Sequence, residues 1–431
     1  MKSVVCGVLL CLALGACSRA GLSSIVREDL FSLDIGRLED QLALYGLEGD
    51  LGLSRVGLAM RDGLFYISDR NGGKLVRYNS YGDLLFMIYN DQSNSAPLSL
   101  KTNREENSIV TRWAFTYPLR EPGQIAVDSR KHIYVEDRLP ADRYYYDADA
   151  RALLDCVVLH FDQEGRFVEY LGQEGVGGTP FSRITGIYTT VQDEIVVVCR
   201  QTTGWLVYWY ASGTRSPLTL NLKSNAIPAP PDWPEVSASV DAIMAAPDSR
   251  ELYLKVDYYR DIYDDSTNTR VGTEPDSSLI WVMDLGTGSY VDCLEVPFLE
   301  QTAFVNGRRE TLRMLYSMMG IARGGRIFLS FPVDEGYSIL ILRRNGENGL
   351  TANVSGSEVS TALVPARAVV PSASLEQSRG LINVDREELY LNSFDLSEDG
   401  IISAILVSDY EAKIAWWRTD RILTEGTPSW P

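Results

Sequence analysis

The feature that most constrains this chain is a doublet of short apolar runs joined by a tight polar turn. In its clearest copy, residues 125–127 and 133–137 flank a turn at 128–132, and further apolar runs follow at 157–161 and 167–172. Short β-type runs separated by Asp, Gly and Ser are typical of a four-stranded antiparallel meander. One meander cannot bury both of its faces alone, so a recurring meander predicts a β-propeller, in which each blade packs on two neighbours.

The doublet recurs six times along the chain, with turns 55 to 77 residues apart. This spacing exceeds the roughly 40–50 residues of compact propeller repeats, so we expect insertions in the blades. The chain is therefore predicted to be all-β, with six four-stranded blades. Seven blades is the alternative, because residues 297–316 have room for further strands. The sixth copy is read as strands at 380–384, 388–392, 401–407 and 413–418, with its turn at Asp385.

The N-terminus has the features of an export signal. One basic residue precedes an apolar run from Val4 to Leu14, which is too short for a membrane span. The next residues, Leu14-Gly15-Ala16-Cys17, resemble a bacterial lipobox. We expect residues 1–16 to be removed and Cys17 to carry acyl chains, since stable anchoring takes more than one chain. The expected location is the bacterial cell envelope, facing the periplasm or the outside. The alternative is an ordinary signal peptide that contains a cysteine.

Residues 17–50 are interpreted as a tether that leads to a propeller domain at 51–431. Residues 31–36 alternate in polarity and end in glycine, which is the pattern of a strand added to a blade edge. Residues 37–45 fit a short helix equally well.

The charge of the chain excludes several kinds of partner. The chain has 40 basic and 58 acidic residues, a formal net charge of −18. Such a surface repels nucleic acid and anionic lipid head groups, so no nucleic acid is expected. We expect a monomer attached to the membrane only through the lipid on Cys17. The three cysteines beyond the anchor, Cys156, Cys199 and Cys293, are interpreted as core residues; a Cys156–Cys199 disulfide is the alternative.

The clearest copy of the doublet also resembles a known repeat. Residues 122–128, 133–137 and 159–165 are similar to an NHL-type repeat, and residues 57–83 form a weaker second copy. With its lipobox, the chain is similar to propeller lipoproteins of the spirochaete envelope. The resemblance implies the propeller fold and the envelope location, and it implies no catalytic residues.

Strand parity predicts where the long loops lie. In a meander, the links from first to second and from third to fourth strand lie on one face of the disc, and the other links lie on the opposite face. All the long segments are expected on the second face. They are two inserts within blades, at 136–156 and 257–278, and four crossings between blades, at 89–120, 225–236, 297–316 and 349–378.

These loops hold the candidate binding residues, because long loops at one end of a rigid scaffold commonly bind ligands. Tyrosine is enriched in recognition surfaces. The alternative is that the tyrosines pack the loops onto the disc and the acids only keep them solvated. No cofactor is predicted, although three aspartates of the second insert could ligate calcium without an EF-hand spacing. The binding candidates are Tyr144, Tyr145, Tyr146, Asp147, Tyr258, Tyr259 and Tyr263, and the calcium candidates are Asp261, Asp264 and Asp265.

The sequence favours a binding protein over an enzyme. Its two histidines, His132 and His160, lie in strand-like runs, and no nucleophile elbow, zinc-protease motif or phosphate-binding loop occurs. We expect a lipid-anchored scaffold that binds an envelope protein with a basic patch. The alternatives are a cell-wall or carbohydrate ligand, and a metal-assisted hydrolase or lactonase that uses carboxylates in the channel.

Overall fold

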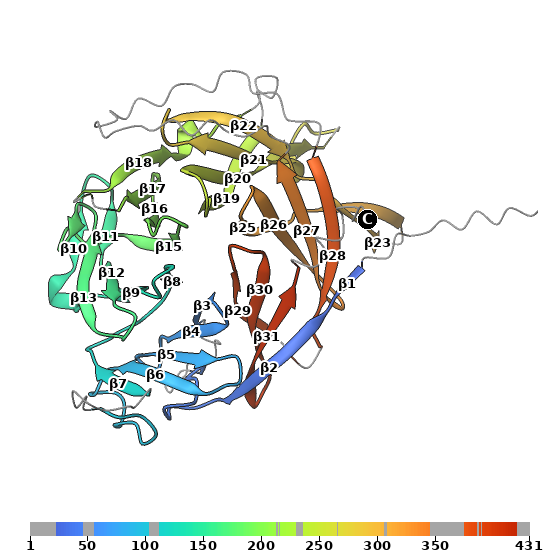
Figure 1. The fold of residues 1–431 in the computed structure, drawn as a ribbon. Helices are drawn as coiled ribbons and strands as arrows, with labels where there is room; N and C mark the ends of the chain where they lie inside the picture. Colours follow the sequence, from blue (N-terminus) through green and yellow to red (C-terminus); the bar gives the residue numbers. More distant parts are fainter. Residues whose placement is uncertain are drawn as a thin grey trace, which may run out of the picture.

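The structure is a computed structural model. It describes residues 23–45, 56–102, 112–212, 214, 216–229, 236–264, 266–305, 308–344, 375–385, 388 and 390–419. Six mainly antiparallel sheets surround a central channel, each running from an inner strand to the rim (Figure 1). The predicted six-bladed β-propeller is therefore confirmed. The only helices among the described residues are two short 3-10 turns, η1 (Ala141–Arg143) and η2 (Ser224–Ala226).

The first three blades follow the chain from the channel outward. Blade 1 ends in an extra strand that runs parallel to its neighbour, and blade 2 carries a hairpin between its second and third strands. Their strands are β3 (Gly57–Arg61), β4 (Leu64–Asp69), β5 (Lys74–Asn79), β6 (Leu84–Tyr89) and β7 (Trp113–Thr116) in blade 1; β8 (Ile125–Val127), β9 (Ile133–Arg138), the hairpin β10 (Tyr145–Asp147) and β11 (Ala152–Leu154), β12 (Cys156–Phe161), β13 (Phe167–Gly172) and β14 (Gly175–Val176) in blade 2; and β15 (Arg183–Thr189), β16 (Ile195–Gln201), β17 (Gly204–Tyr210) and β18 (Leu218–Lys223) in blade 3.

The last three blades contain two departures from that order. Blades 5 and 6 each take an outer strand from the N-terminus, and a separate hairpin lies between blades 4 and 5. Their strands are β19 (Val236–Ala245), β20 (Glu251–Tyr263), β21 (Arg270–Asp284) and β22 (Ser289–Glu295) in blade 4; the hairpin β23 (Leu299–Val305) and β24 (Arg308–Met314); β25 (Ser317–Ala322), β26 (Arg326–Val333), β27 (Gly336–Arg344), β28 (Leu375–Asn383) and β1 (Ser23–Ile25) in blade 5; and β29 (Tyr390–Leu396), β30 (Ile401–Val407), β31 (Glu411–Arg418) and β2 (Arg27–Asp34) in blade 6.

The core consists of six buried clusters, one between each pair of neighbouring blades. Successive side chains of a strand point to opposite faces, so both sets must be apolar when both faces are covered. In β4, Phe65 and Ile67 face blade 6 whereas Tyr66 faces blade 2. This explains why the strands read as continuous apolar runs. Each large side chain buried in this way contributes about 1.5–3 kcal/mol to stability.

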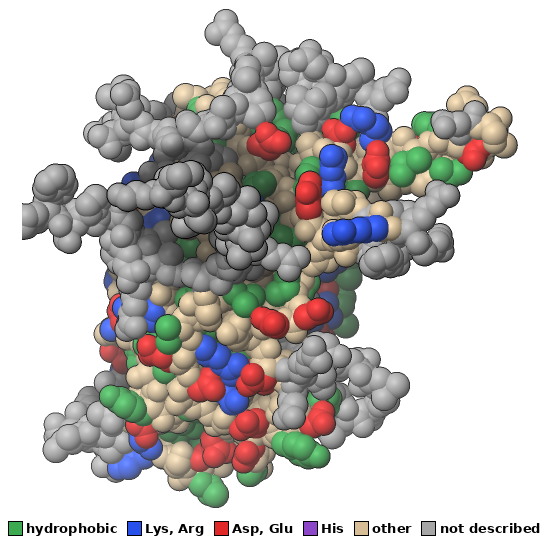
Figure 2. Space-filling view, turned by 90° about the vertical axis from the view of Figure 1, so that its right-hand side faces the viewer, with side chains coloured by type: hydrophobic (Ala, Val, Ile, Leu, Met, Phe, Trp, Pro, Cys, Tyr) green, Lys and Arg blue, Asp and Glu red, His purple; other side chains and the backbone are tan. Residues whose placement is uncertain are grey.

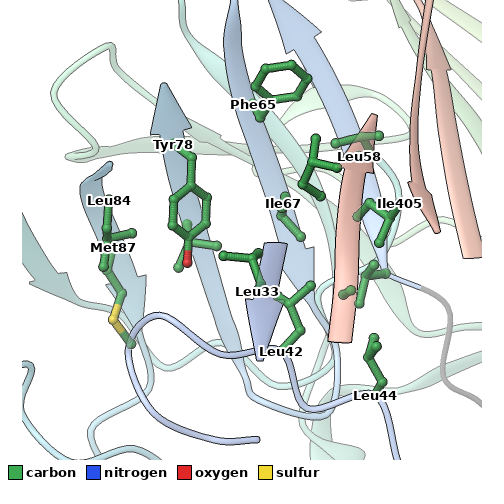
Figure 3. Close-up of a cluster of buried hydrophobic side chains, with 14 of the residues drawn as sticks. Leu33, Leu42, Leu44, Leu58, Phe65, Ile67, Tyr78, Leu84, Met87 and Ile405 are labelled. Atoms are coloured by element: carbon green, nitrogen blue, oxygen red, sulfur yellow. The ribbon is translucent and has the colours of Figure 1, made fainter. Parts of the chain in front are cut away.

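Figure 3 shows the cluster between blades 1 and 6. Phe65, Ile67 and Tyr78 of blade 1 point toward Ile405 of blade 6, and Leu33 of β2 packs among them. Leu42 and Leu44, from the loop that follows β2, lie at one end of the cluster and are fully buried. The first and last blades are thus joined by a core that the N-terminal segment completes.

Residues 297–316 do not form a seventh blade. Their two strands, β23 and β24, pair with each other and with no other described strand. The predicted alternative of seven blades is therefore wrong, because a blade needs a sheet that reaches the channel.

The N-terminal strand closes the ring. Of the two alternatives for residues 29–50, the strand is present and the helix is not: β2 pairs with β31, and residues 37–45 hold no helix. Residues 380–384 were assigned to the first strand of blade 6, but residues 380–383 form the end of β28, the fourth strand of blade 5. Blade 6 therefore has only three strands from its own stretch of chain, and β2 supplies the fourth along the rim (Figure 1).

Strand direction divides the disc into two faces. We call the "turn face" the end that holds the first-to-second links, at 62–63, 128–132, 190–194, 246–250, 323–325 and 397–400, and we call the opposite end the "insert face". The inserts of blades 2 and 4 leave from the insert face, as predicted. Two assignments change with β28. The link between the third and fourth strands of blade 5, predicted as a crossing between blades, starts after Arg344 and ends before Leu375, and its residues lie outside the described part of the chain. Asp385, predicted in a first-to-second link, belongs to the insert-face link between blades 5 and 6.

The turn face is held together by polar contacts between neighbouring blades. An acidic side chain or a backbone group of one blade reaches the next, all the way around the disc. The contacts are Lys131 with Asp62 at 3.6 Å, the Ser129 N–H donating to Asp193 at 2.8 Å, the Val191 N–H to the Pro247 carbonyl at 2.8 Å, the Gly324 N–H to Asp248 at 2.7 Å, and Arg323 and Arg61 with Glu398 at 2.5 and 3.2 Å.

Candidate functional site

The insert of blade 2 is rigid at its base. The Leu139 N–H donates to the Asp155 carbonyl at 2.8 Å, and the side chains of Leu139 and Leu154 are buried. The hairpin β10–β11 rises from this base, and Asp147 Oδ1 accepts the N–H groups of Asp149 and Ala150 in its turn. The base therefore holds the tip of the hairpin in one place.

The first strand of the hairpin and the residue before it present the predicted tyrosines to solvent. Tyr144, Tyr145 and Tyr146 are 37%, 57% and 62% exposed. Tyr144 also lines a cleft of about 290 Å³ between blades 1 and 2, to which Arg138 contributes. Four of the seven predicted binding residues, these tyrosines and Asp147, therefore lie together on one hairpin.

The tyrosines of blade 4 differ from one another. Tyr263, near the tip of the long β20–β21 hairpin, is 53% exposed, and Tyr259 is half-buried. Tyr258 is fully buried: its hydroxyl donates to the Pro228 carbonyl and accepts the Trp281 Nε1–H at 2.9 Å. Burial raises the Tyr258 pKa. Tyr258 is thus a core residue that a partner cannot reach, which corrects its prediction as a binding residue.

The acids of the blade 4 hairpin are engaged locally. Asp261 pairs with Arg270 at 2.9 Å. Asp264 Oδ1 accepts hydrogen bonds from the side chains and backbones of Ser266 and Thr267, which lower the Asp264 pKa to about 2. Asp265, the third calcium candidate, lies outside the described residues. Over the part of the chain that the structure describes, no three His, Cys, Asp or Glu side chains gather to hold a metal ion.

The two inserts belong to blades that are not neighbours. Blade 3 lies between blade 2 and blade 4 (Figure 1). The blade 2 hairpin is therefore a site of its own.

The central channel forms a cavity. All six inner strands line it, and its volume is about 1300 Å³. Two of its carboxylates accept hydrogen bonds from the backbone. The Met60 N–H donates to Asp395 at 2.9 Å, and the Gln124 N–H donates to Glu136 at 3.0 Å. Burial raises the pKa of both carboxyls, that of Asp395 to about 6.

The charge of the channel lining was not foreseen from the sequence. Six arginines and four carboxylates of the described residues line it, whereas acids outnumber bases in the whole chain. The sequence gives no local sign of this excess, because the arginines come from separate strands and loops of several blades. The lining arginines are Arg61, Arg70, Arg138, Arg151, Arg183 and Arg200.

His160 and the three cysteines are buried, and His160 lies in strand β12 as predicted, whereas His132 is half-buried in the turn-face link 128–132 and not in a strand. His132 Nδ1 is 2.9 Å from His160 Nε2, and Tyr134 stacks on the His160 ring at 4.5 Å. Burial lowers the His160 pKa, which favours the neutral ring. The three cysteines Cys156, Cys199 and Cys293 are buried and free, so the alternative of a Cys156–Cys199 disulfide is wrong.

The predicted anchor, Cys17, lies outside the described residues. Within the described part of the chain, no helix is long and apolar enough to cross a membrane.

Comparisons with known proteins give structural similarity only. No protein-family model and no curated protein matches the chain. Among solved structures, the gluconolactonase XC5397 from Xanthomonas campestris is 9% identical with a TM-score of 0.38, and the match covers 92% of this chain and 97% of that one. Polysaccharide lyase Uly1 is 11% identical with a TM-score of 0.41 and coverages of 92% and 99%. The WD40 β-propeller domain of Doa1 is 10% identical with a TM-score of 0.33 and coverages of 90% and 96%.

Proposed function

We propose that the protein is a lipid-anchored binding protein of the bacterial cell envelope, which holds a partner protein at the hairpin of blade 2. The observation that carries this proposal is the row of three exposed tyrosines, Tyr144–Tyr146, on a hairpin with a packed base. Tyrosine provides a large contact area and loses little conformational entropy on binding. A pre-organised base lowers the cost of ordering the loop further.

The charges beside the tyrosines favour a basic partner surface. Asp142 and Asp149 are exposed on the same insert, and no described basic side chain pairs with them. Complementary charge mainly raises the rate of association, and salt screens it over about 8 Å at physiological strength. We therefore expect association to slow as salt rises.

The anchor would leave this site accessible. Cys17 is six residues before Ser23, so the tether spans at most about 20 Å from the start of β1. β1 lies on the rim, against β28, and not on either face. Figure 2 looks at this rim and shows acidic and basic side chains intermingled on its described part. A lipid at Cys17 would therefore hold the disc by its edge.

The test compares two sets of tyrosines. The lipidated wild-type protein, a Tyr144/Tyr145/Tyr146→Ala variant and a Tyr81→Ala control would be crosslinked in cells and purified from solubilised envelopes. Tyr81 is a matched control because it is 86% exposed in a turn of the opposite, turn face. One recurring protein should be recovered with the wild type and the control, and at least tenfold less with the triple variant. Equal recovery with all three proteins, or no recurring protein, would contradict the proposal.

A further inference from the structure

Two arginines face each other at the insert-face end of blade 3. Arg183 of β15 and Arg200 of β16 are directly opposed in the strand register, and both line the channel cavity. Like charges at opposed positions destabilise a sheet. The Arg200 guanidinium lies 4.7 Å from the centre of the Trp205 ring, which holds it in place. The fold thus keeps an unfavourable pair at the mouth of its cavity.

A third arginine joins them from blade 2. Arg151 is the last residue of the β10–β11 turn and lines the same cavity. The Thr202 hydroxyl, in the turn after β16, donates to the Arg151 carbonyl at 3.2 Å. This contact ties the hairpin of blade 2 to the end of blade 3 that carries Arg200.

These three arginines have no counter-charge among the described residues. Arg151, Arg183 and Arg200 are all exposed, and no described carboxylate pairs with any of them. By contrast, the neighbouring Arg138 is neutralised by Glu121 at 2.9 Å and Asp155 at 3.1 Å. In a chain with a net charge of −18, three adjacent unpaired cations at a cavity mouth form a local positive site.

The groups between the arginines indicate the kind of anion. Hydroxyl and amide side chains line the cavity beside them, from Ser182, Thr185, Gln201 and Thr202. Arginine matches carboxylates with paired donors, and neutral polar groups match hydroxyls. The cavity of about 1300 Å³ exceeds the roughly 300–1,000 Å³ of ordinary small-molecule sites, so it has room for several linked units.

We propose that Arg151, Arg183 and Arg200 form a binding site for an oligosaccharide that carries carboxylate groups. The guanidinium groups bind the carboxylates, and the surrounding hydroxyl and amide groups bind the sugar hydroxyls. This site is separate from the tyrosine hairpin proposed to hold a partner protein, and it neither requires nor excludes that partner.

The test uses tetragalacturonate as the probe, titrated by calorimetry into the purified protein without its signal and lipid. Neutral cellotetraose and a tetraglutamate peptide serve as comparisons. The wild type should bind tetragalacturonate with a Kd that rises with salt, and it should bind cellotetraose at least tenfold more weakly. Absence of tetragalacturonate binding, or equal binding of the tetraglutamate peptide, would overturn the proposal.

Two variants then locate the site. Arg183→Gln/Arg200→Gln should weaken tetragalacturonate binding at least tenfold, and it should melt at the same or a higher temperature because the opposed charges are removed. Arg166→Gln is the matched control, because Arg166 is an exposed arginine in a turn-face link of blade 2. The affinity of this variant for tetragalacturonate should stay within twofold of that of the wild type. Unchanged binding by the double variant, with its fold intact, would place the ligand elsewhere. Capture of the envelope partner through the tyrosines should persist in this variant.

Discussion

Closure of the ring should depend on one carboxylate, Glu388. It lies in the link between blades 5 and 6, and it accepts two hydrogen bonds from Arg27 of β2, at 2.6 and 2.5 Å. Lys413 of β31 donates to it at 2.8 Å. Glu388 therefore joins the N-terminal strand to the blade that this strand completes. We predict that Glu388→Gln destabilises the whole disc.

The size of the effect can be worked from the pKa of Glu388. Burial raises that pKa, but the hydrogen bonds from Arg27 and Lys413 outweigh burial and lower it from 4.5 to about 2. At 1.36 kcal/mol per pKa unit, this shift corresponds to at most about 3 kcal/mol of stability at pH 7. The side chains of Arg27 and Lys413 remain 14% and 24% exposed, so solvent screens part of that energy. We expect a loss of about 1.5–2 kcal/mol in Glu388→Gln.

The stabilisation by Glu388 should depend on pH. Because the folded-state pKa is lowered, the stabilisation is present above pH 4.5 and is lost as the pH falls toward 2. The free energy of unfolding, from urea titrations followed by tryptophan fluorescence, should differ between wild type and Glu388→Gln at pH 7, and by less than half as much near pH 3. Glu411→Gln, on β31 of the same blade, is the control and should change little. A difference that is absent at pH 7, or equal at both pH values, would show that the ionised Glu388 side chain does not stabilise the closed ring.

Three further predictions concern single residues. Tyr258→Phe should lower the free energy of unfolding by about 1–3 kcal/mol in the same urea titration, since the Pro228 carbonyl and Trp281 Nε1–H lose their partner; an unchanged value would contradict its role in the core. Cys17→Ser should abolish fatty-acid labelling and partition into detergent, and labelling at the wild-type level would disprove the anchor. Asp395→Asn should flatten the pH dependence of the melting temperature, because burial raises the Asp395 pKa to about 6 and the wild type loses stability as the pH rises through that value; equal pH dependence in both proteins would argue against this.

The blades could be predicted because their signals are local. Each doublet lies within a few residues of its own turn, so residues 125–137 alone indicate two paired strands. Closure of the ring has no such local signal. Arg27 of β2 pairs in register with Trp417 of β31, almost 400 residues further along the chain. The sequence of residues 27–34 does not indicate which strand it pairs with. A four-stranded blade 6 was therefore predicted with residues 380–384, the nearest available run, as its first strand.

The candidate site was predicted in part for the same reason. Tyr144, Tyr145 and Tyr146 belong to a short hairpin whose composition is typical of recognition surfaces, and the structure shows that they are exposed. Tyr258 also has tyrosine neighbours in the sequence, but its side chain is buried in the core. It belongs to the buried part of strand β20, which extends from residue 252 to residue 258. The arginines of the channel mouth were missed altogether, because only the folded ring brings them together.

Contact between the hairpin of blade 2 and the partner can be measured with a photo-crosslinking amino acid placed at Tyr145 in one strain and at Tyr81 in another, with irradiation of intact cells. We expect one discrete adduct from position 145, lost when Tyr144 and Tyr146 are alanine, and none from position 81. An adduct from position 81 with none from position 145 would show that the partner binds the turn face.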